Sequence, residues 1–112
     1  MQPAKLEILR QPGANGRLIA RLNGKLSLET VSAFLQETRA IDADKLVLDM
    51  GGVSFLDSAG VGALVQLFVH RRGQSKTLAL AALTPQGKAV LQVAGLTRLL
   101  PHFATVEEAS VA

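Results

Sequence analysis

The chain of 112 residues contains no cysteine, no tryptophan and no tyrosine, and only four phenylalanines. Without cysteine it has neither a disulfide framework nor a thiolate metal site, a composition that suits a reducing compartment. Its twelve basic residues are scattered, and only Arg71 and Arg72 are adjacent. Nucleic-acid binding normally uses a basic stripe with stacking rings. We therefore expect no nucleic-acid partner and attribute the net charge of +3 to solubility.

A membrane-spanning run is also missing. The most apolar helical segment is interrupted by Gln66 and ends at His70, whereas a bilayer span needs about 20 apolar residues. The first eight residues are too charged, and too short in apolar run, for a signal peptide. We expect a cytoplasmic protein with no direct membrane insertion.

Patterns that carry catalysis are missing as well. His70 and His102 lie far apart and have no carboxylate at a metal or triad spacing. The pair Gly60 and Gly62 lacks the third glycine of a dinucleotide fingerprint, and no glycine stands two residues before Ser58, as a nucleophile elbow requires. Catalysis also needs an activated nucleophile with a base in reach. We expect no enzyme, and no catalytic, cofactor or metal site.

What the chain does contain is an alternation of strand and helix patterns. A chain of this length forms one domain, residues 1–112. Strands alternating with helices imply right-handed parallel crossovers, and a turn-rich loop over 11–16 implies one antiparallel hairpin. We expect an α/β fold: a small, mostly parallel mixed β-sheet of four to five strands with helices packed against it. The expected strands cover 6–9, 17–22, 46–48 and 78–83, with a short edge strand near 99–100. The expected helices cover 28–38, 59–73 and 85–94, followed by a last helical turn. Ser27, Thr84 and Thr105 are the expected caps of the first, third and last of these helices.

The most informative segment follows the apolar run 46–48. Asp49 is expected to end that strand, and the two glycines after it to release the backbone into a turn. Asp57 and Ser58 supply cap chemistry for the next helix. One interpretation is that Asp49 only ends the strand and Asp57 only assists the cap. The other is that both lie near the Ser58 hydroxyl, because sites in open sheets lie at the carboxyl ends of strands.

The helix that follows begins almost without side chains, at residues 59–62. Glycine inside a helix costs about 1 kcal/mol relative to alanine, so small residues here indicate that something approaches the backbone closely. One interpretation is a helix packed within its own domain, and the other is a docking surface. The pattern by itself favours the first.

Residues 48–64 closely resemble the central motif of STAS domains, in particular the bacterial anti-sigma factor antagonists. That motif is a hydrophobic strand ending in Asp, a short loop, then Asp-Ser-Ser/Ala-Gly-Leu/Val-Gly at a helix start. Residues 22–26 resemble the family's glycine-containing turn after the second strand, 83–96 its third helix and exit, and 103–109 its closing helix. The resemblance covers nearly the whole chain in order and implies a single STAS domain over 1–112.

The resemblance also implies a function. Antagonists of this family bind an anti-sigma factor that is a serine kinase, which releases the sigma factor in a partner-switching system. The kinase phosphorylates the serine that matches Ser58, and a metal-dependent serine phosphatase restores binding, so ATP and metal belong to the partners. Many relatives have Ser-Ser where this chain has Ser58-Ala59. The implied contact surface is Leu56, Asp57, Ala59, Gly60, Val61 and Gly62, with Lys25 and Leu26 as weaker members.

Elementary electrostatics agrees with such a switch. A phosphoserine carries roughly −1.5 to −2 charges, and backbone N–H groups of the turn 59–61 are expected to hold it. A partner docked on the bare turn would instead meet bulk and charge. Two alternatives stay open: a STAS subunit that binds the ATPase of an ABC-type phospholipid transporter, and a scaffold in a larger stress-signalling assembly. The identity of the kinase and the oligomeric state stay open too.

Overall fold

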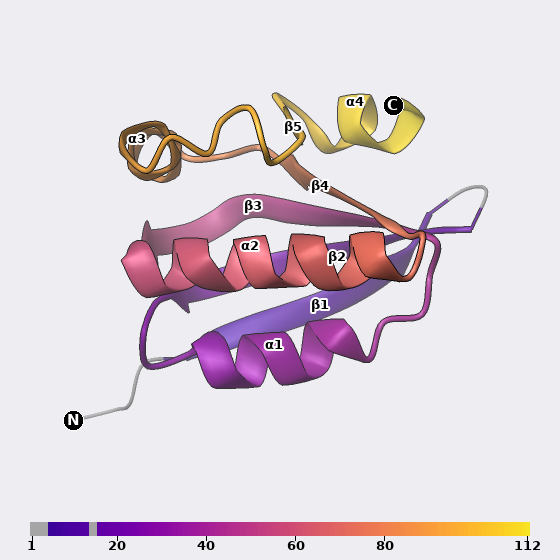
Figure 1. The fold of residues 1–112 in the computed structure, drawn as a ribbon, viewed down its shortest axis with the longest axis horizontal. Helices are drawn as coiled ribbons and strands as arrows, with labels where there is room; N and C mark the ends of the chain where they lie inside the picture. Colours follow the sequence, from indigo (N-terminus) through magenta and orange to yellow (C-terminus); the bar gives the residue numbers. More distant parts are fainter. Residues whose placement is uncertain (1–4, 14–15) are drawn as a thin grey trace.

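The computed structural model describes residues 5–13 and 16–112. They form a five-stranded sheet with the strand order β1-β2-β3-β4-β5, in which β1 pairs antiparallel with β2 and every other pair is parallel. This confirms the predicted mixed, mostly parallel α/β fold (Figure 1). The predicted hairpin loop over 11–16 includes residues 14–15, which lie outside the described residues. The elements are β1 (Leu6–Pro12), β2 (Arg17–Leu26), α1 (Val31–Arg39), β3 (Lys45–Leu56), α2 (Ser58–Gly73), β4 (Thr77–Ala81), α3 (Pro85–Val93), β5 (His102–Phe103) and α4 (Val106–Val111).

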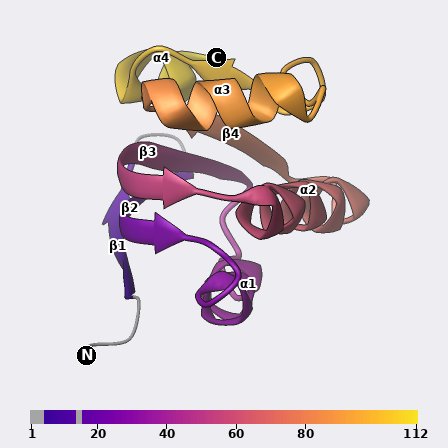
Figure 2. The same cartoon turned by 90° about the vertical axis from the view of Figure 1, so that its left-hand side faces the viewer.

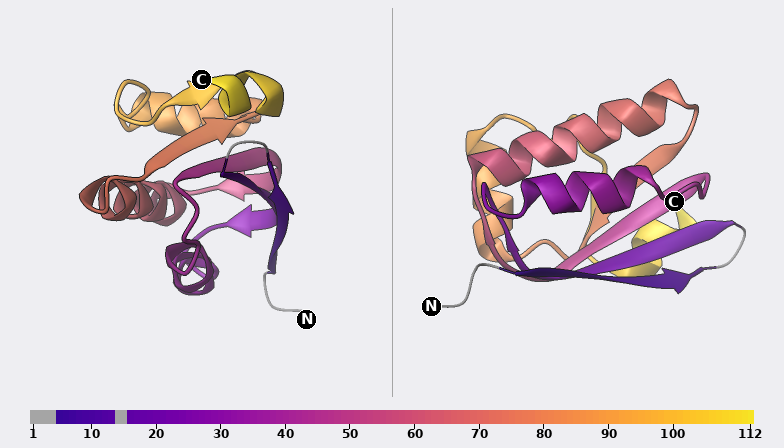
Figure 3. Two further views of the ribbon diagram at one scale, coloured as in Figure 1. Left: turned by 90° about the vertical axis from the view of Figure 1, so that its right-hand side faces the viewer. Right: turned by 90° about the horizontal axis from the view of Figure 1, so that it is seen from below.

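The two faces of the sheet are covered unequally. Helices α1 and α2 lie side by side against one face (Figure 3), and the main hydrophobic core forms there, with Leu22, Phe34 and Leu64 fully buried in it. A smaller cluster on the other face joins Val47 and Ala109 and brings α4 against the sheet. Strand β3 serves both clusters because successive side chains of a strand point to opposite faces.

Strand β3 is longer than predicted. Asp49 does not end it: the strand continues to Leu56, and β2 likewise continues past residues 23–24 to Leu26. Neither glycine forms a turn, because both lie within β3. Gly52 is required by close approach, since a Cβ there would lie 2.5 Å from the Leu22 carbonyl oxygen. The β2–β3 register shifts twice in this stretch, which absorbs the irregular backbone.

Strand β1 extends beyond the predicted 6–9 to Pro12, β4 covers Thr77–Ala81 and not 78–83, and two further elements begin later than predicted. Helix α1 begins after Thr30 and not after Ser27, because the Thr30 hydroxyl accepts from the Ser27 N–H and donates to the Lys25 carbonyl, closing a turn before the helix. The last strand follows Pro101 and does not cover 99–100. The caps of α3 and α4 are as predicted: the Thr84 and Thr105 hydroxyls accept from N–H groups of the first helical turns.

Arg71 anchors the far end of α2. Its side chain is only 1 % exposed, and its guanidinium donates to the carbonyl oxygens of Thr77 at 2.8 Å, Ile41 at 3.2 Å and Ala43. Burial lowers the pKa of Arg71 below its usual value, yet arginine keeps its proton in proteins. One cation therefore ties α2 to the α1–β3 connection and to the start of β4.

Replacing Arg71 and, separately, its neighbour Arg72 distinguishes the loss of the buried hydrogen bonds from the loss of one positive charge. Arg71→Met leaves three carbonyl oxygens without their charged donor, so we expect the free energy of unfolding to fall by about 3 kcal/mol. Arg72→Met is the matched control, because Arg72 is exposed, and surface changes of this kind stay within about 0.5 kcal/mol. Urea unfolding followed by circular dichroism measures both. Equal losses in the two variants would contradict the anchoring role.

Candidate functional site

The carboxyl ends of β2 and β3 lie at one edge of the sheet, and α1 and α2 begin beside them (Figures 1 and 2). Parallel crossovers produce this arrangement, since each helix starts where the preceding strand finishes. Ser58 is the first residue of α2 and is exposed. The hydroxyl proposed as a phosphate acceptor is therefore accessible.

Asp57, and not Ser58, caps the helix. Its Oδ1 accepts from the Gly60 N–H at 2.8 Å, and its Oδ2 accepts from the Leu28 N–H at 3.1 Å. The Asp57 N–H donates to the Leu26 carbonyl at 3.4 Å. One aspartate thus fixes the start of α2 to the β2–α1 connection, and within the described residues the Ser58 hydroxyl takes part in no hydrogen bond.

A second tether holds the residue before the cap. The Gln86 side chain at the start of α3 donates to the Leu56 carbonyl at 2.7 Å and accepts from the Leu56 N–H at 3.0 Å. The amide pairs with the strand end much as a neighbouring strand would. Leu56 and Asp57 are consequently held from two sides, and Ser58 follows on a preorganised backbone. Sequence reasoning missed Gln86, because a glutamine in a first helical turn carries no distinctive signal.

The N–H groups available to an anion differ from the predicted set. The Gly60 N–H is bound by Asp57 Oδ1 and the Val61 N–H by the Asp57 carbonyl. The first N–H groups of a helix have no intrahelical partner. Across residues 5–13 and 16–112 no hydrogen bond is found for the N–H of Ser58 or Ala59, so these two, and not Gly60 and Val61, can approach a phosphate on Ser58.

Only some residues of the predicted contact surface are exposed. Leu26, Leu56 and Gly60 are buried in the domain itself, so these three residues are not exposed where the prediction placed a contact surface. Gly60 is small for an internal reason: a Cβ there would lie 2.2 Å from the Leu26 carbonyl oxygen. Val61 is mostly buried as well, whereas Lys25 and Ser58 are exposed and Asp57, Ala59 and Gly62 are half-buried.

Two apolar side chains next to the site were not predicted. Leu28 is 74 % exposed and Phe55 is 43 % exposed, and both line a hollow of about 200 Å³ together with Lys25 and Asp57. Both lie in apolar segments of the sequence, so pattern does not distinguish them from core residues. The register shifts near the end of β3 turn Phe55 outward, and the short turn before α1 leaves Leu28 at the surface.

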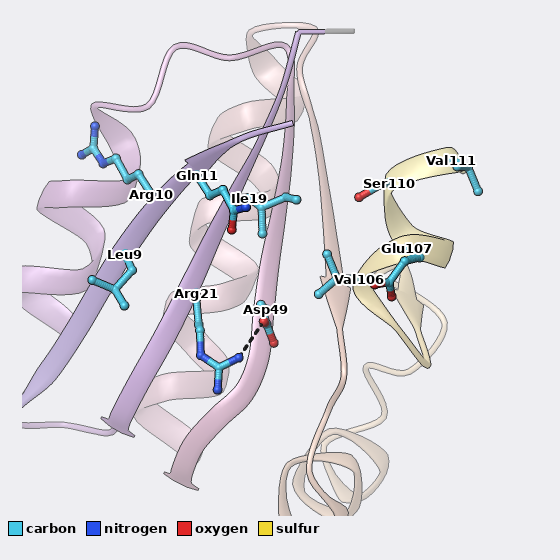
Figure 4. Close-up of a pocket in the computed structure, with 10 residues that line it drawn as sticks. All are labelled: Leu9, Arg10, Gln11, Ile19, Arg21, Asp49, Val106, Glu107, Ser110 and Val111. Atoms are coloured by element: carbon cyan, nitrogen blue, oxygen red, sulfur yellow. Dashed lines mark hydrogen bonds and ion pairs between the residues drawn. The ribbon is translucent and has the colours of Figure 1, made fainter. Parts of the chain in front are cut away.

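Asp49 is not near Ser58, so the interpretation that placed both aspartates beside the hydroxyl is wrong for Asp49. It lies in the middle of β3, so seven strand residues, or about 20 Å, separate it from the start of α2. Its carboxylate accepts from Arg21 at 3.2 Å and from the Gly51 N–H at 3.0 Å. It lines a separate hollow of about 770 Å³ between the sheet and α4, shown in Figure 4 with the Arg21–Asp49 ion pair.

The fold and this helix start define an α/β domain of the STAS type. A STAS domain family model matches residues 5–109, and the chain belongs to that family. None of the helices in the described part of the chain is long and apolar enough to cross a membrane.

Solved structures share the fold at low identity. An anti-sigma factor antagonist from Mycobacterium paratuberculosis is 22 % identical with a TM-score of 0.83, over 94 % of this chain and 91 % of that chain. A sulfate transporter family protein from Wolinella succinogenes is 18 % identical with a TM-score of 0.78, over 90 % and 87 %. The anti-sigma factor antagonist SpoIIAA in its unphosphorylated form is 21 % identical with a TM-score of 0.75, over 92 % of this chain and 92 % of that chain. The phosphorylated form of SpoIIAA from Bacillus is 21 % identical with a TM-score of 0.69, over 92 % of this chain and 96 % of that chain. At these identities the likeness shows the fold alone.

Gly60 and Gly62 lie in the same helical turn, but only Gly60 packs closely against the rest of the domain. Alanine substitutions at the two positions test this difference. Gly60→Ala places a methyl group against the Leu26 carbonyl, and we expect it to lower the free energy of unfolding by about 2 kcal/mol. A Cβ at Gly62 meets nothing within 4 Å, so Gly62→Ala should raise stability by about 0.5–1 kcal/mol. Chemical unfolding of both variants measures the difference. If Gly60→Ala were as stable as Gly62→Ala, the internal packing of this turn would be wrong.

Proposed function

We propose that this chain is an anti-sigma factor antagonist of a bacterial partner-switching system, and that it acts by binding and not by catalysis. Its partner is an anti-sigma factor serine kinase, and its regulated residue is Ser58. The observation that carries the proposal is the exposed serine at the first position of α2, held by Asp57 and by the tether on Leu56. A hydroxyl in that position is accessible to a kinase without any opening of the domain.

Phosphorylation transfers the terminal phosphoryl group of ATP to Ser58 Oγ, with loss of the hydroxyl proton and release of ADP. The phosphate adds roughly −1.5 to −2 charges at a helix N-terminus, where the dipole and the N–H groups of Ser58 and Ala59 favour an anion. Folding therefore tolerates it. A partner in contact with Leu28 and Phe55 on one side of Ser58 would have to desolvate that charge, which weakens binding.

The comparison with SpoIIAA supports the separation of binding from folding. The unphosphorylated and phosphorylated forms of that protein both match the fold of this chain over more than nine-tenths of its length. A phosphorylated relative can therefore keep the STAS fold. Because Ser58 stays exposed, a metal-dependent serine phosphatase has the access needed to remove the phosphate and restore binding.

The experiment pairs this chain with the anti-sigma factor kinase from the same genome and ATP. We expect one phosphate per chain, located at Ser58 by mass spectrometry and absent in Ser58→Ala. We also expect Ser58→Asp to bind the kinase at least roughly tenfold more weakly than wild type in calorimetry, because a desolvated like charge or unpaired charge in a contact costs more than 1 kcal/mol.

The matched control places the same charge at the other end of the helix. Ser75 is exposed just beyond α2, about 24 Å of helix from Ser58, and its backbone φ of 61° suits aspartate. Ser75→Asp should bind the kinase as wild type does. Phosphate found only at another residue, or equal affinity for Ser58→Asp and wild type, would contradict the mechanism. Retention of a transporter ATPase in place of the kinase would support the transporter-subunit alternative.

A further inference from the structure

The two edges of the sheet differ in length. Strand β5 forms one edge and has two residues, and a short edge strand is one way in which proteins limit pairing with other chains. Strand β1 forms the opposite edge with seven residues, in an unbroken register with β2 (Figure 3). Within residues 5–13 and 16–112, β2 is the single strand that pairs with β1. The outer side of β1 is therefore long and regular enough to pair with a further strand.

The register fixes which backbone groups of β1 point outward. In an antiparallel pair, opposite residues alternate between those that exchange two hydrogen bonds and those that exchange none. The Gly13 N–H donates to the Arg17 carbonyl at 2.9 Å, and the Lys25 N–H donates to the Lys5 carbonyl at 3.4 Å. Both pairs continue the β1–β2 register, so the odd-numbered residues of β1 direct their backbone groups to β2 and the even-numbered residues direct theirs away from the sheet. The outward N–H groups are those of Leu6, Ile8 and Arg10.

The two faces of β1 carry different side chains. Ile8 packs against the main core, and the Arg10 guanidinium on the same face donates to the Glu37 carbonyl of α1 at 3.2 Å. Leu9 lies on the other face, at the border of the hollow that Arg21 lines (Figure 4), and is 52 % exposed. A leucine exposed at the middle of an open edge strand favours coverage by another chain.

A second copy of β1 is complementary to this edge in one register. Because only even-numbered residues direct backbone groups outward, antiparallel pairing of two copies sets even-numbered residues opposite even-numbered residues. Three such registers pair at least five residues of each β1. One sets Arg10 opposite Arg10, and like charges directly opposite are destabilising, while another sets Leu9 opposite the charged Glu7. The third pairs all seven residues, with Leu9 opposite Leu9 and Glu7 opposite Gln11.

We propose that the β1 edge joins two copies of this chain into a symmetric dimer, in which the two sheets become continuous and Leu9 of each copy lies at the two-fold axis. The contact is isologous, as in most dimers of identical chains. Ile8 of each copy would exchange two backbone hydrogen bonds with Arg10 of the other. The edge contains no residue of the candidate site, so the inference goes beyond the proposed function and does not depend on it.

Sedimentation measures the association. One strand per copy is a small contact beside the roughly 1,200 Å² that stable complexes bury, so we expect a weak dimer whose population rises between roughly 10 μM and 1 mM chain. Leu9→Lys sets like charges opposite each other and should raise the dissociation constant roughly tenfold or more. Val69→Lys is the matched control, because Val69 is 60 % exposed in α2, and it should associate as wild type does.

Disulfide cross-linking measures the register. The chain has no cysteine, so each variant carries a single thiol. In the proposed register the two copies of residue 9 form a non-hydrogen-bonded pair with Cα atoms about 4.5 Å apart, within the range that a disulfide spans. The two copies of residue 11 lie four residues apart along the strands, or about 14 Å. We expect a mild oxidant to cross-link Leu9→Cys at least roughly tenfold faster than Gln11→Cys.

A mixture of two variants checks the same register independently. Glu7 and Gln11 are opposite each other in the proposed dimer, so an equal mixture of Glu7→Cys and Gln11→Cys should give the mixed disulfide in preference to either symmetric one. Preference for a disulfide between Glu7→Cys and Leu9→Cys would assign the shifted register and overturn the proposed one.

The remaining outcomes decide whether a second copy occupies the edge. A wild-type chain that stays monomeric up to roughly 1 mM overturns the dimer, and so does a dimer in which Leu9→Cys and Gln11→Cys cross-link at equal rates. A monomeric chain whose Leu9→Cys thiol the kinase protects from a thiol reagent would assign the edge to a strand of that partner and overturn the dimer too. None of these results bears on phosphorylation of Ser58.

Discussion

The site depends on one aspartate that makes two hydrogen bonds. The carboxylate of Asp57 joins the first turn of α2, through Gly60, to the β2–α1 connection, through Leu28. Both oxygens act as acceptors of backbone N–H groups, the strongest use of a carboxylate at a helix start. The exposed Ser58 follows directly on this cap, and the first turn of α2 lies so close to the end of β2 that residue 60 must be small.

In the proposed switch, this arrangement would let a charge at Ser58 weaken partner binding without unfolding the domain. Ser58 lies outside the network that holds the backbone, because Asp57 caps the helix and Gln86 secures the strand end. The free N–H groups and the helix dipole accept an anion at that position. In the proposed switch, a partner bound to the apolar surface around Phe55 would lose complementarity when the anion arrives.

Sequence pattern predicted the alternating elements, the helix caps at Thr84 and Thr105 and the start of α2, because these depend on local propensity and local hydrogen bonding. It failed where the cause is non-local. The extension of β3 past Asp49 depends on pairing with β2, and the burial of Arg71 depends on carbonyl groups of the distant α1–β3 connection as well as the start of β4. The contact between Gly60 and the Leu26 carbonyl is also non-local. The sequence shows that residue 60 is small, but it does not show whether the neighbour that requires this lies in the same domain or in a partner.

The most direct test of the account measures amide hydrogen exchange at Gly60 and Leu28 in the chain carrying phosphoserine at position 58, beside the unmodified chain. These two N–H groups are the ones that Asp57 binds. The account predicts unchanged protection of both amides in the phosphorylated chain together with weaker binding of the kinase. Exchange faster by about tenfold or more at both positions would mean that the phosphate displaces Asp57 and opens the helix start, which contradicts it.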